Sequence, residues 1–399
     1  MIDFSLPPDV EELAERVRAF VREVCIPAEA RDRGHGLDPA LRAELQAEAR
    51  RAGVFAPHIA SQYGGLGLDI RGWSVVFEEA GYSLLGPPAL NCAAPDEGNM
   101  HLLAHVANAE QKERYLRPLA AGDTRSCFAM SEPPPGAGSD PSMLRTAAER
   151  VAGGWAIDGE KRFITGAEGA AFAICMARTG EEPDAATMFL VDADSPGFLV
   201  TRLIGTMDSS ATGGHAEVSF EHCLVPEEAV LGEVGQGFRY AQVRLGPARL
   251  THCMRWLGLA RRALDVALDR SAEREAFGSR LQDLGMAQAM IADSVIDIES
   301  SQALIRRCAW LLDSGEHARH ETSIAKVHVA EAVNRVVDRS IQLCGGDGVS
   351  ENLPLARFLG EVRPFRIYDG PSETHRFAIA RRASRRRARE RDTADGGAP

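Results

Sequence analysis

The spacing of apolar positions divides the 399-residue chain into three regions. Residues 9 to about 124 carry apolar residues at helical spacing, as in VEELAERVRAFVREV, and this pattern predicts amphipathic helices. Asp38-Pro39 offers an N-cap followed by proline at the first helical position, which predicts the start of a helix. Gly53, the stretch 63–67 and Gly86-Pro87 are expected to divide this region into several helices.

The other two regions have different periods. From about 125 to 232, short alternating runs between clusters of glycine, proline and aspartate predict an antiparallel β-domain. After Gly235-Gln236-Gly237 the helical period returns in three long stretches, which is typical of a helical bundle. The predicted fold is therefore α+β, with an N-terminal helical domain (1–124), a middle β-domain (125–232) and a C-terminal helical bundle (233–383). The arginine-dense tail is predicted to be a frayed, solvated helix end that leads into disorder, with residues 384–399 as a disordered basic tail.

Composition narrows the class of protein. The net charge of −12 argues against nucleic acid as a partner, because phosphate binding needs clustered cations. The N-terminus is acidic where a signal peptide would be basic, and no apolar run approaches the length of about 18 residues that a membrane span needs. These features predict a cytoplasmic protein without a membrane partner. The eight cysteines include no C-x-x-C pair, so we expect buried, reduced thiols and no metal site.

Two segments around the start of the β-domain could bind a ligand. FAMSEPPPGAGSD, residues 128–140, is rich in small residues that let backbone N–H groups approach an anionic or carbonyl-rich ligand, although it could also be a plain surface loop. In WAIDGEKRFITGA, residues 155–167, strand alternation places Phe163 and Thr165 on one face and Ile164 on the other. An aromatic ring beside a hydroxyl suits a planar heterocycle, but an aromatic that fills a β-core is equally consistent with this segment.

These two segments, within the α–β–α order, resemble the acyl-CoA dehydrogenase family. The resemblance implies that family's fold, with a C-terminal four-helix bundle, and FAD as the cofactor. It implies roles for seven residues of the two segments. The residues expected at the flavin edge are Phe128, Met130 and Ser131. Gly138 and Ser139 are expected in the loop over the flavin phosphate and the substrate, and Phe163 and Thr165 at the face of the flavin ring.

Further motifs extend the resemblance to the C-terminal region. EREAFGSRL resembles the R-x-x-F-G motif, which implies that Arg274 and Phe277 contact the FAD of a neighbouring subunit. A guanidinium suits this role because it donates to a diphosphate in a bidentate manner. The family often carries a glutamine seven residues after the glycine of this motif. Gln288 stands one helical turn after that position and is expected to take over its contact with the cofactor. QLCGGDG resembles Q-x-x-G-G-x-G, and the remaining cofactor residues that the resemblance implies are Gln342, Gly345, Gly346 and Glu373. A shared FAD site implies a homodimer or homotetramer.

The segment RIYDGPSETHR resembles the family's I-Y-E-G-T motif, in which the glutamate removes the α-proton of the acyl thioester. The resemblance implies that Asp369 is the catalytic base and that Arg249 lies beside it. It also implies substrate contacts from Ser139, Arg249, Tyr368 and Gly370. The residues alone leave another interpretation open, because Asp-Gly-Pro-Ser-Glu also fits a helix start that an aspartate would cap.

The expected reaction is therefore FAD-dependent α,β-dehydrogenation of an acyl-CoA thioester in fatty acid metabolism, with an electron-transfer flavoprotein as the electron acceptor. Nitroalkane oxidase resembles the same family and uses an aspartate base, so a flavin-dependent oxidase is the alternative. Aspartate is shorter than glutamate by one methylene, about 1.5 Å in reach. The sequence does not explain how the shorter side chain reaches the α-carbon.

Overall fold

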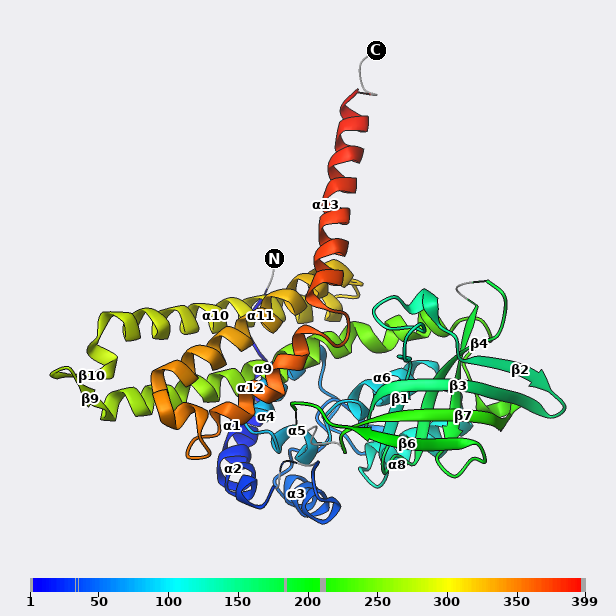
Figure 1. Cartoon of the computed structure of the whole chain (residues 1–399), viewed down its shortest axis with the longest axis horizontal. Coiled ribbons are helices and arrows are strands. Elements are labelled where there is room, and N and C mark those ends of the chain that lie inside the picture. The colour runs from blue at the N-terminus through cyan, green and yellow to red at the C-terminus, as the bar shows by residue number, and fades with distance from the viewer. Residues whose placement is uncertain (1–2, 33, 35, 183–184, 209–212, 396–399) are drawn as a thin grey trace.

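The computed structural model describes residues 3–395 except 33, 35, 183–184 and 209–212. Along the chain a group of helices is followed by a β-sheet and then by long helices (Figure 1). The predicted α+β class, with this order of elements, is confirmed.

The N-terminal region consists of short and medium helices. Their bounds are α1 Pro8–Phe20, α2 Ile26–Ala28, α3 Pro39–Arg51, α4 Ile70–Gly81, α5 Gly86–Ala89, α6 Asp96–Val106, α7 Ala109–Gln111 and α8 Arg117–Ala120. The predicted start of α3 is confirmed, since the Asp38 carboxylate accepts hydrogen bonds from the backbone N–H groups of Ala40 (2.7 Å) and Leu41 (3.2 Å). This cap satisfies two amide groups that would otherwise lack partners within the helix.

The middle region is one eight-stranded sheet with the strand order β6-β7-β3-β2-β4-β5-β8, and β1 pairs with β4. The strands are β1 Ser126–Ala129, β2 Ala147–Val151, β3 Gly154–Thr165, β4 Phe172–Arg178, β5 Ala186–Asp192, β6 Phe198–Ile204, β7 His215–Pro226 and β8 Val230–Leu231. The prediction of a purely antiparallel sheet is wrong in one respect, because β1 runs parallel to β4 and β2 meets β4 in a parallel pair. The long connections between these strands allow parallel pairing, which a tight hairpin cannot make.

Three long helices dominate the C-terminal region and lie side by side in Figure 1. The elements of this region are α9 Gly237–Glu273, β9 Glu275–Ala276, β10 Ser279–Arg280, α10 Gly285–Asp313, α11 Arg319–Cys344, α12 Leu355–Val362 and α13 Ser372–Asp395. Helices α12 and α13 pack on α11, and the outer part of α13 projects from the body (Figure 1).

The prediction of a disordered tail needs correction. Helix α13 continues to Asp395, so residues 384–395 are helical, while 396–399 lie outside the described residues. Arginine and alanine are good helix formers. Glu390 also forms ion pairs with Arg386 (3.6 Å) and Arg387 (3.3 Å) at helical spacing, and such pairs support an exposed helix.

All eight cysteines are buried, as predicted. In the part of the chain that the structure describes, no helix combines the length and the apolar character that crossing a membrane requires.

Helices α4 and α9 approach so closely that glycine is needed where they meet. A Cβ added to Gly258 would lie 2.0 Å from the backbone oxygen of Glu78, and one added to Gly81 would lie 2.0 Å from that of Arg255. Replacing Gly258 with alanine should therefore lower the free energy of unfolding by about 3 kcal/mol, the upper end of the usual overpacking cost. Urea denaturation would measure the change.

Gly285, at the start of α10, provides the control because an added Cβ meets nothing within 4 Å. Alanine there should change the free energy of unfolding by at most about 1 kcal/mol, since alanine is only moderately better than glycine in a helix. Equal effects of the two substitutions would contradict a close helix contact at Gly258.

Candidate active site

Asp369 lies in the turn between Arg366 and the start of α13, and its backbone is held from three sides. The Asp369 carbonyl oxygen accepts hydrogen bonds from Arg249 Nε (2.9 Å) and His375 Nε2 (3.1 Å). The next carbonyl, that of Gly370, accepts from Lys326 Nζ (2.7 Å). Gly370 has a φ of +95°, and a Cβ there would lie 2.8 Å from His375 Nε2, so only glycine fits the turn.

The Asp369 carboxylate itself lacks a close partner. Its side chain is 17% exposed, and Oδ2 is buried without a hydrogen bond to any described residue. The nearest basic atom is His252 Nε2, at 3.4 Å. No backbone N–H of the described chain donates to this carboxylate, and the helix starts three residues later, at Ser372. The helix-cap interpretation of Asp369 is therefore wrong, and one oxygen remains available to a ligand.

The charges around Asp369 keep it ionised. Burial alone would raise its pKa, but His252 beside it and the cations of Arg244, Arg249 and Lys326 outweigh burial and hold the pKa below its ordinary value of 3.8. Burial also lowers the pKa of Lys326, to about 8, so that this lysine is mostly protonated at neutral pH. The site therefore presents a carboxylate that can accept a proton.

Lys326 is a site residue that the sequence analysis missed. It lies on α11 and is fully buried, and Nζ donates to the carbonyl oxygens of Phe365 (2.8 Å) and Gly370 (2.7 Å). The signal in the sequence was a single lysine in the mostly apolar stretch SIAKVHVAEAV. Its role is to tie the turn that carries Asp369 to the helical bundle.

Arg244 of α9, also missed, connects the Asp369 region with the sheet. Its guanidinium carbon lies 4.1 Å from the centre of the Phe128 ring, and Nε donates to Asn99 Oδ1 (2.7 Å). The charge of Arg244 also helps to lower the pKa of Asp369. The fold thus brings β1 and the Asp369 turn together around α9.

Tyr368 turns its hydroxyl toward the protein interior. The hydroxyl oxygen accepts the indole N–H of Trp256 (2.5 Å) and lies 3.4 Å from His252 Nδ1. Burial raises the pKa of Tyr368 well above its ordinary value. Its side chain therefore supports His252, and a direct contact with substrate stays a prediction.

The loop that follows β1 is fixed by a buried ion pair. Lys161 Nζ lies 3.0 Å from Glu132 Oε1 and also donates to the carbonyl oxygens of Met130 (3.2 Å) and Met176 (2.7 Å). Next to Met130, Ser131 Oγ donates to the backbone of the neighbouring strand β3 (2.7 Å). Both charged side chains were overlooked at the sequence level, although Lys161 belongs to the hairpin motif.

Glu132 also organises the far side of this loop. Its carboxylate accepts backbone N–H groups from Ala137 (3.1 Å), Arg145 (2.7 Å) and Thr146 (2.9 Å). Burial opposes ionisation, but Lys161 and the hydrogen bonds from Thr146 outweigh it and lower the pKa of Glu132 to about 2. The loop therefore closes around a permanently charged carboxylate.

The hairpin residues differ in burial. Phe163 is 51% exposed at a bulge of β3, where its φ is +58°, whereas Ile164 is 1% exposed. The Thr165 hydroxyl is half-buried and lies 2.9 Å from His215 Nδ1. Gly138 and Ser139 lie in an exposed loop, and a Cβ at Gly138 would meet nothing within 4 Å. The Phe163 ring is thus partly open to a ligand, although the Arg162 guanidinium lies over it, 5.0 Å from the ring centre.

The remaining predicted cofactor residues lie elsewhere on the surface. Phe277 is 95% exposed in the β9–β10 hairpin, which Figure 1 places at the end of the bundle remote from the sheet. Within one chain the structure therefore does not bring this residue to Phe163. The other predicted cofactor residues of the C-terminal region are also exposed: Arg274, Gln288, Gln342, Gly345, Gly346 and Glu373.

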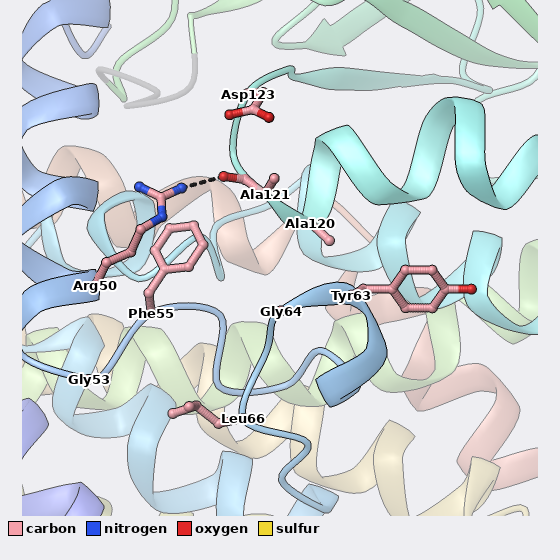
Figure 2. Close-up of a pocket in the computed structure, with 9 residues that line it drawn as sticks. All are labelled: Arg50, Gly53, Phe55, Tyr63, Gly64, Leu66, Ala120, Ala121 and Asp123. Atoms are coloured by element: carbon pink, nitrogen blue, oxygen red, sulfur yellow. Dashed lines mark hydrogen bonds between the residues drawn. The ribbon is translucent and has the colours of Figure 1, made fainter.

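One pocket of the described residues lies away from these side chains. Figure 2 shows this pocket of about 460 Å³ between the end of α3, the following loop and the end of α8. Arg50 lines it, stacking 3.9 Å from the Phe55 ring centre and donating to the Ala121 carbonyl. No predicted site residue lines it, so the site is recognised by its chemistry rather than by cavity size. Among the described residues, no cluster of histidine, cysteine, aspartate and glutamate could hold a metal ion.

Comparison with protein families gives one consistent result. The chain matches the acyl-CoA dehydrogenase N-terminal domain over residues 7–123, the middle domain over 127–223 and the C-terminal domain over 235–384. A probable acyl-CoA dehydrogenase, FadE2 of Mycobacterium tuberculosis, is 36% identical over 95% of this chain and 96% of its own length. Acyl-CoA dehydrogenase family member 11 of Rattus norvegicus is 35% identical, and the match spans 95% of this chain but only 51% of that protein.

Solved structures give the same result. A putative acyl-CoA dehydrogenase from Mycobacterium abscessus has a TM-score of 0.88 and 35% identity, with 96% of this chain and 99% of that chain covered. Butyryl-CoA dehydrogenase from Megasphaera elsdenii has a TM-score of 0.85 and 27% identity, with 95% and 98% covered.

Proposed function

Because the chain belongs to the acyl-CoA dehydrogenase family, we propose that it is an FAD-dependent enzyme that converts an acyl-CoA thioester to the trans-2-enoyl-CoA. The observation that carries this proposal is the buried Asp369 oxygen without a hydrogen-bond partner. Buried polar atoms are normally paired, and an unpaired one calls for an explanation such as a catalytic role. A carboxylate that no described residue hydrogen-bonds can take up a proton from a substrate.

In this proposal Asp369 accepts the α-proton of the thioester. The turn around it is held in place, because Arg249 donates a hydrogen bond to the backbone carbonyl of Asp369 and Lys326 donates one to that of Gly370. A fixed backbone keeps the carboxylate in place, and general-base catalysis requires hydrogen-bond reach to the proton. Tyr368, Gly370, Arg249 and Ser139 are the proposed substrate contacts.

The residues proposed to hold FAD fit a large planar group with phosphates. The Phe163 ring is partly exposed, the loop at Gly138 is open, and Ser131 and Lys161 fix the backbone between them. Phe128, Met130, Ser139 and Thr165 complete this proposed flavin surface. Bound FAD would supply the hydride acceptor, and an electron-transfer flavoprotein is the proposed electron acceptor.

The exposed groups at the far end of the bundle support a shared cofactor site. Arg274 and Phe277 are remote from the sheet of their own chain but could reach that of a second copy (Figure 1). Gln288, Gln342, Gly345, Gly346 and Glu373 are proposed to join them. We therefore propose a homodimer or homotetramer with domains 1–124, 125–232 and 233–383, located in the cytoplasm and active in fatty acid metabolism.

The aspartate at the base position favours a second candidate, a flavin-dependent oxidase of the nitroalkane-oxidase type. Anaerobic titration of the FAD-loaded protein with butanoyl-, octanoyl- and branched acyl-CoA esters separates the two. A dehydrogenase loses its 450 nm absorbance with at least one ester and is reoxidised slowly by O₂. Bleaching by nitroethane alone, followed by rapid reoxidation in air, would overturn the proposed function.

A further inference from the structure

His252 stands between Asp369 and a buried arginine. It follows Arg249 by one helical turn on α9, and its side chain is 12% exposed. One ring nitrogen, Nε2, lies 3.4 Å from Asp369 Oδ2, and the other, Nδ1, lies 3.3 Å from Arg255 Nη2. The ring therefore links the carboxylate to a guanidinium.

The neighbours of Nδ1 determine which nitrogen carries the proton. A guanidinium can only donate, so Nδ1 must accept from Arg255. The Tyr368 hydroxyl, 3.4 Å from Nδ1, already accepts the Trp256 N–H and can turn its own proton toward the same nitrogen. Since both neighbours need the lone pair of Nδ1, the ring proton of a neutral His252 lies on Nε2, toward Asp369.

The charge of His252 follows from the same surroundings. Burial and Arg255 lower the pKa of His252 to about 3, with Arg244 and Lys326 acting in the same direction and Asp369 against it. His252 is therefore neutral at pH 7. A neutral N–H donor can orient the carboxylate without adding a positive charge, and an added charge would weaken Asp369 as a base.

Arg255 is itself held in place by a second layer. Its Nη1 donates to the Cys92 carbonyl (2.8 Å) and lies 3.3 Å from Glu97 Oε2, and Thr251 Oγ1 donates to the same Glu97 oxygen (2.9 Å). Arg255 is 5% and Glu97 is 1% exposed, so water does not compete for these contacts. Side chains of α6 and α9 thus fix the arginine that fixes His252.

We propose that His252 is a positioning residue that holds Asp369 Oδ2 through its Nε2 proton, and that Arg255 keeps His252 in the required tautomer. This inference rests on the proposed function, in which Asp369 takes the α-proton. Holding Oδ2 leaves Oδ1 for the substrate and fixes the short side chain in one orientation. The distance of 3.4 Å exceeds that of a formed hydrogen bond, and catalytic hydrogen bonds are often long until substrate binds.

Two substitutions of His252 test the donor. His252→Gln keeps an N–H group near the position of Nε2, whereas His252→Leu removes it at similar volume. We expect the leucine variant to lose about 10- to 100-fold in kcat with little change in KM, the size of a lost hydrogen bond to a charged group. The glutamine variant should recover most of that loss. Equal losses in the two variants would show that His252 only fills space, and would overturn the proposal.

The role of Arg255 is tested through the pH profile. Because removing Arg255 alone would leave Glu97 buried and unpaired, the variant combines Arg255→Met with Glu97→Gln. In this variant burial still lowers the pKa of His252, but without Arg255 that pKa should rise from about 3 toward its ordinary value, so kcat should gain an acidic limb at higher pH. The wild type should lack that limb. An unchanged profile in the double variant would overturn the role of Arg255.

A spectroscopic measurement separates this inference from the proposed function. In ¹⁵N-histidine-labelled protein at pH 7, Nδ1 of His252 should show the shift of an unprotonated nitrogen and Nε2 that of a protonated one. A protonated Nδ1 would overturn the inference regardless of activity. If the wild type oxidises no acyl-CoA ester, the proposed function fails, and the tautomer still decides whether His252 directs a proton at Asp369.

Discussion

Asp369→Asn should lower kcat for acyl-CoA oxidation by about 10²- to 10⁴-fold, the usual contribution of a general base. An amide cannot take up the α-proton, and among the described residues the side chains that bind the Asp369 carbonyl or face its carboxylate carry no carboxylate: Arg249, His375 and His252. Stopped-flow bleaching of the flavin under anaerobic conditions would measure the step directly. FAD content and melting temperature, measured in parallel, report whether the fold is intact.

Asp369→Glu should be measured beside Asp369→Asn because it restores a carboxylate at this position. The backbone is held by Arg249, His375 and, through Gly370, Lys326, so the turn cannot retreat to make room for the longer side chain. A misplacement of about 1 Å can cost about 10²-fold in rate. We expect the glutamate variant to lie between the wild type and the asparagine variant. Turnover of Asp369→Asn within tenfold of the wild type would rule out Asp369 as the base.

The second large effect is expected on stability, from Lys161→Met. Lys161 Nζ is buried with Glu132 and bonds two carbonyl oxygens as well. Removing it leaves the Glu132 carboxylate charged and unpaired, and breaking a buried pair in this way costs about 3–5 kcal/mol. The affinity for FAD should fall too, because Met130 loses its anchor. Urea unfolding followed by circular dichroism, with FAD titration of the folded variant, would measure both effects.

The matched control is Arg150→Met in the neighbouring strand β2. Arg150 pairs with Glu227 at 2.9 Å, but these side chains are 63% and 47% exposed. Exposed pairs contribute about 0–1 kcal/mol, so this variant should unfold almost as the wild type does. Similar losses at Arg150 and Lys161 would contradict the assignment of the buried pair as an anchor.

Much of the fold could be predicted from the sequence because its signals are local. Helical spacing of apolar residues gave the α–β–α order, and Asp38-Pro39 gave the start of α3. The parallel pairing of β1 with β4 could not be predicted, because the alternation of apolar and polar residues along a strand does not indicate which other strand it pairs with. The prediction of a frayed helix end underestimated the length of α13, because its arginines resemble those of a disordered segment and the i,i+4 ion pair that supports the helix forms only in the helix itself.

The sequence by itself determined the type of fold, the family and the identity of Asp369 as the candidate base, since each of these depends on residue types at fixed spacing. Only the tertiary structure decided that Asp369 is not a helix cap, that Lys326 and Arg249 hold its turn, and that His252 faces its carboxylate. These contacts join α9, α11 and the turn before α13, which are distant in the chain. Their physical effect depends on burial and on the direction of each side chain, and neither property follows from spacing along the sequence.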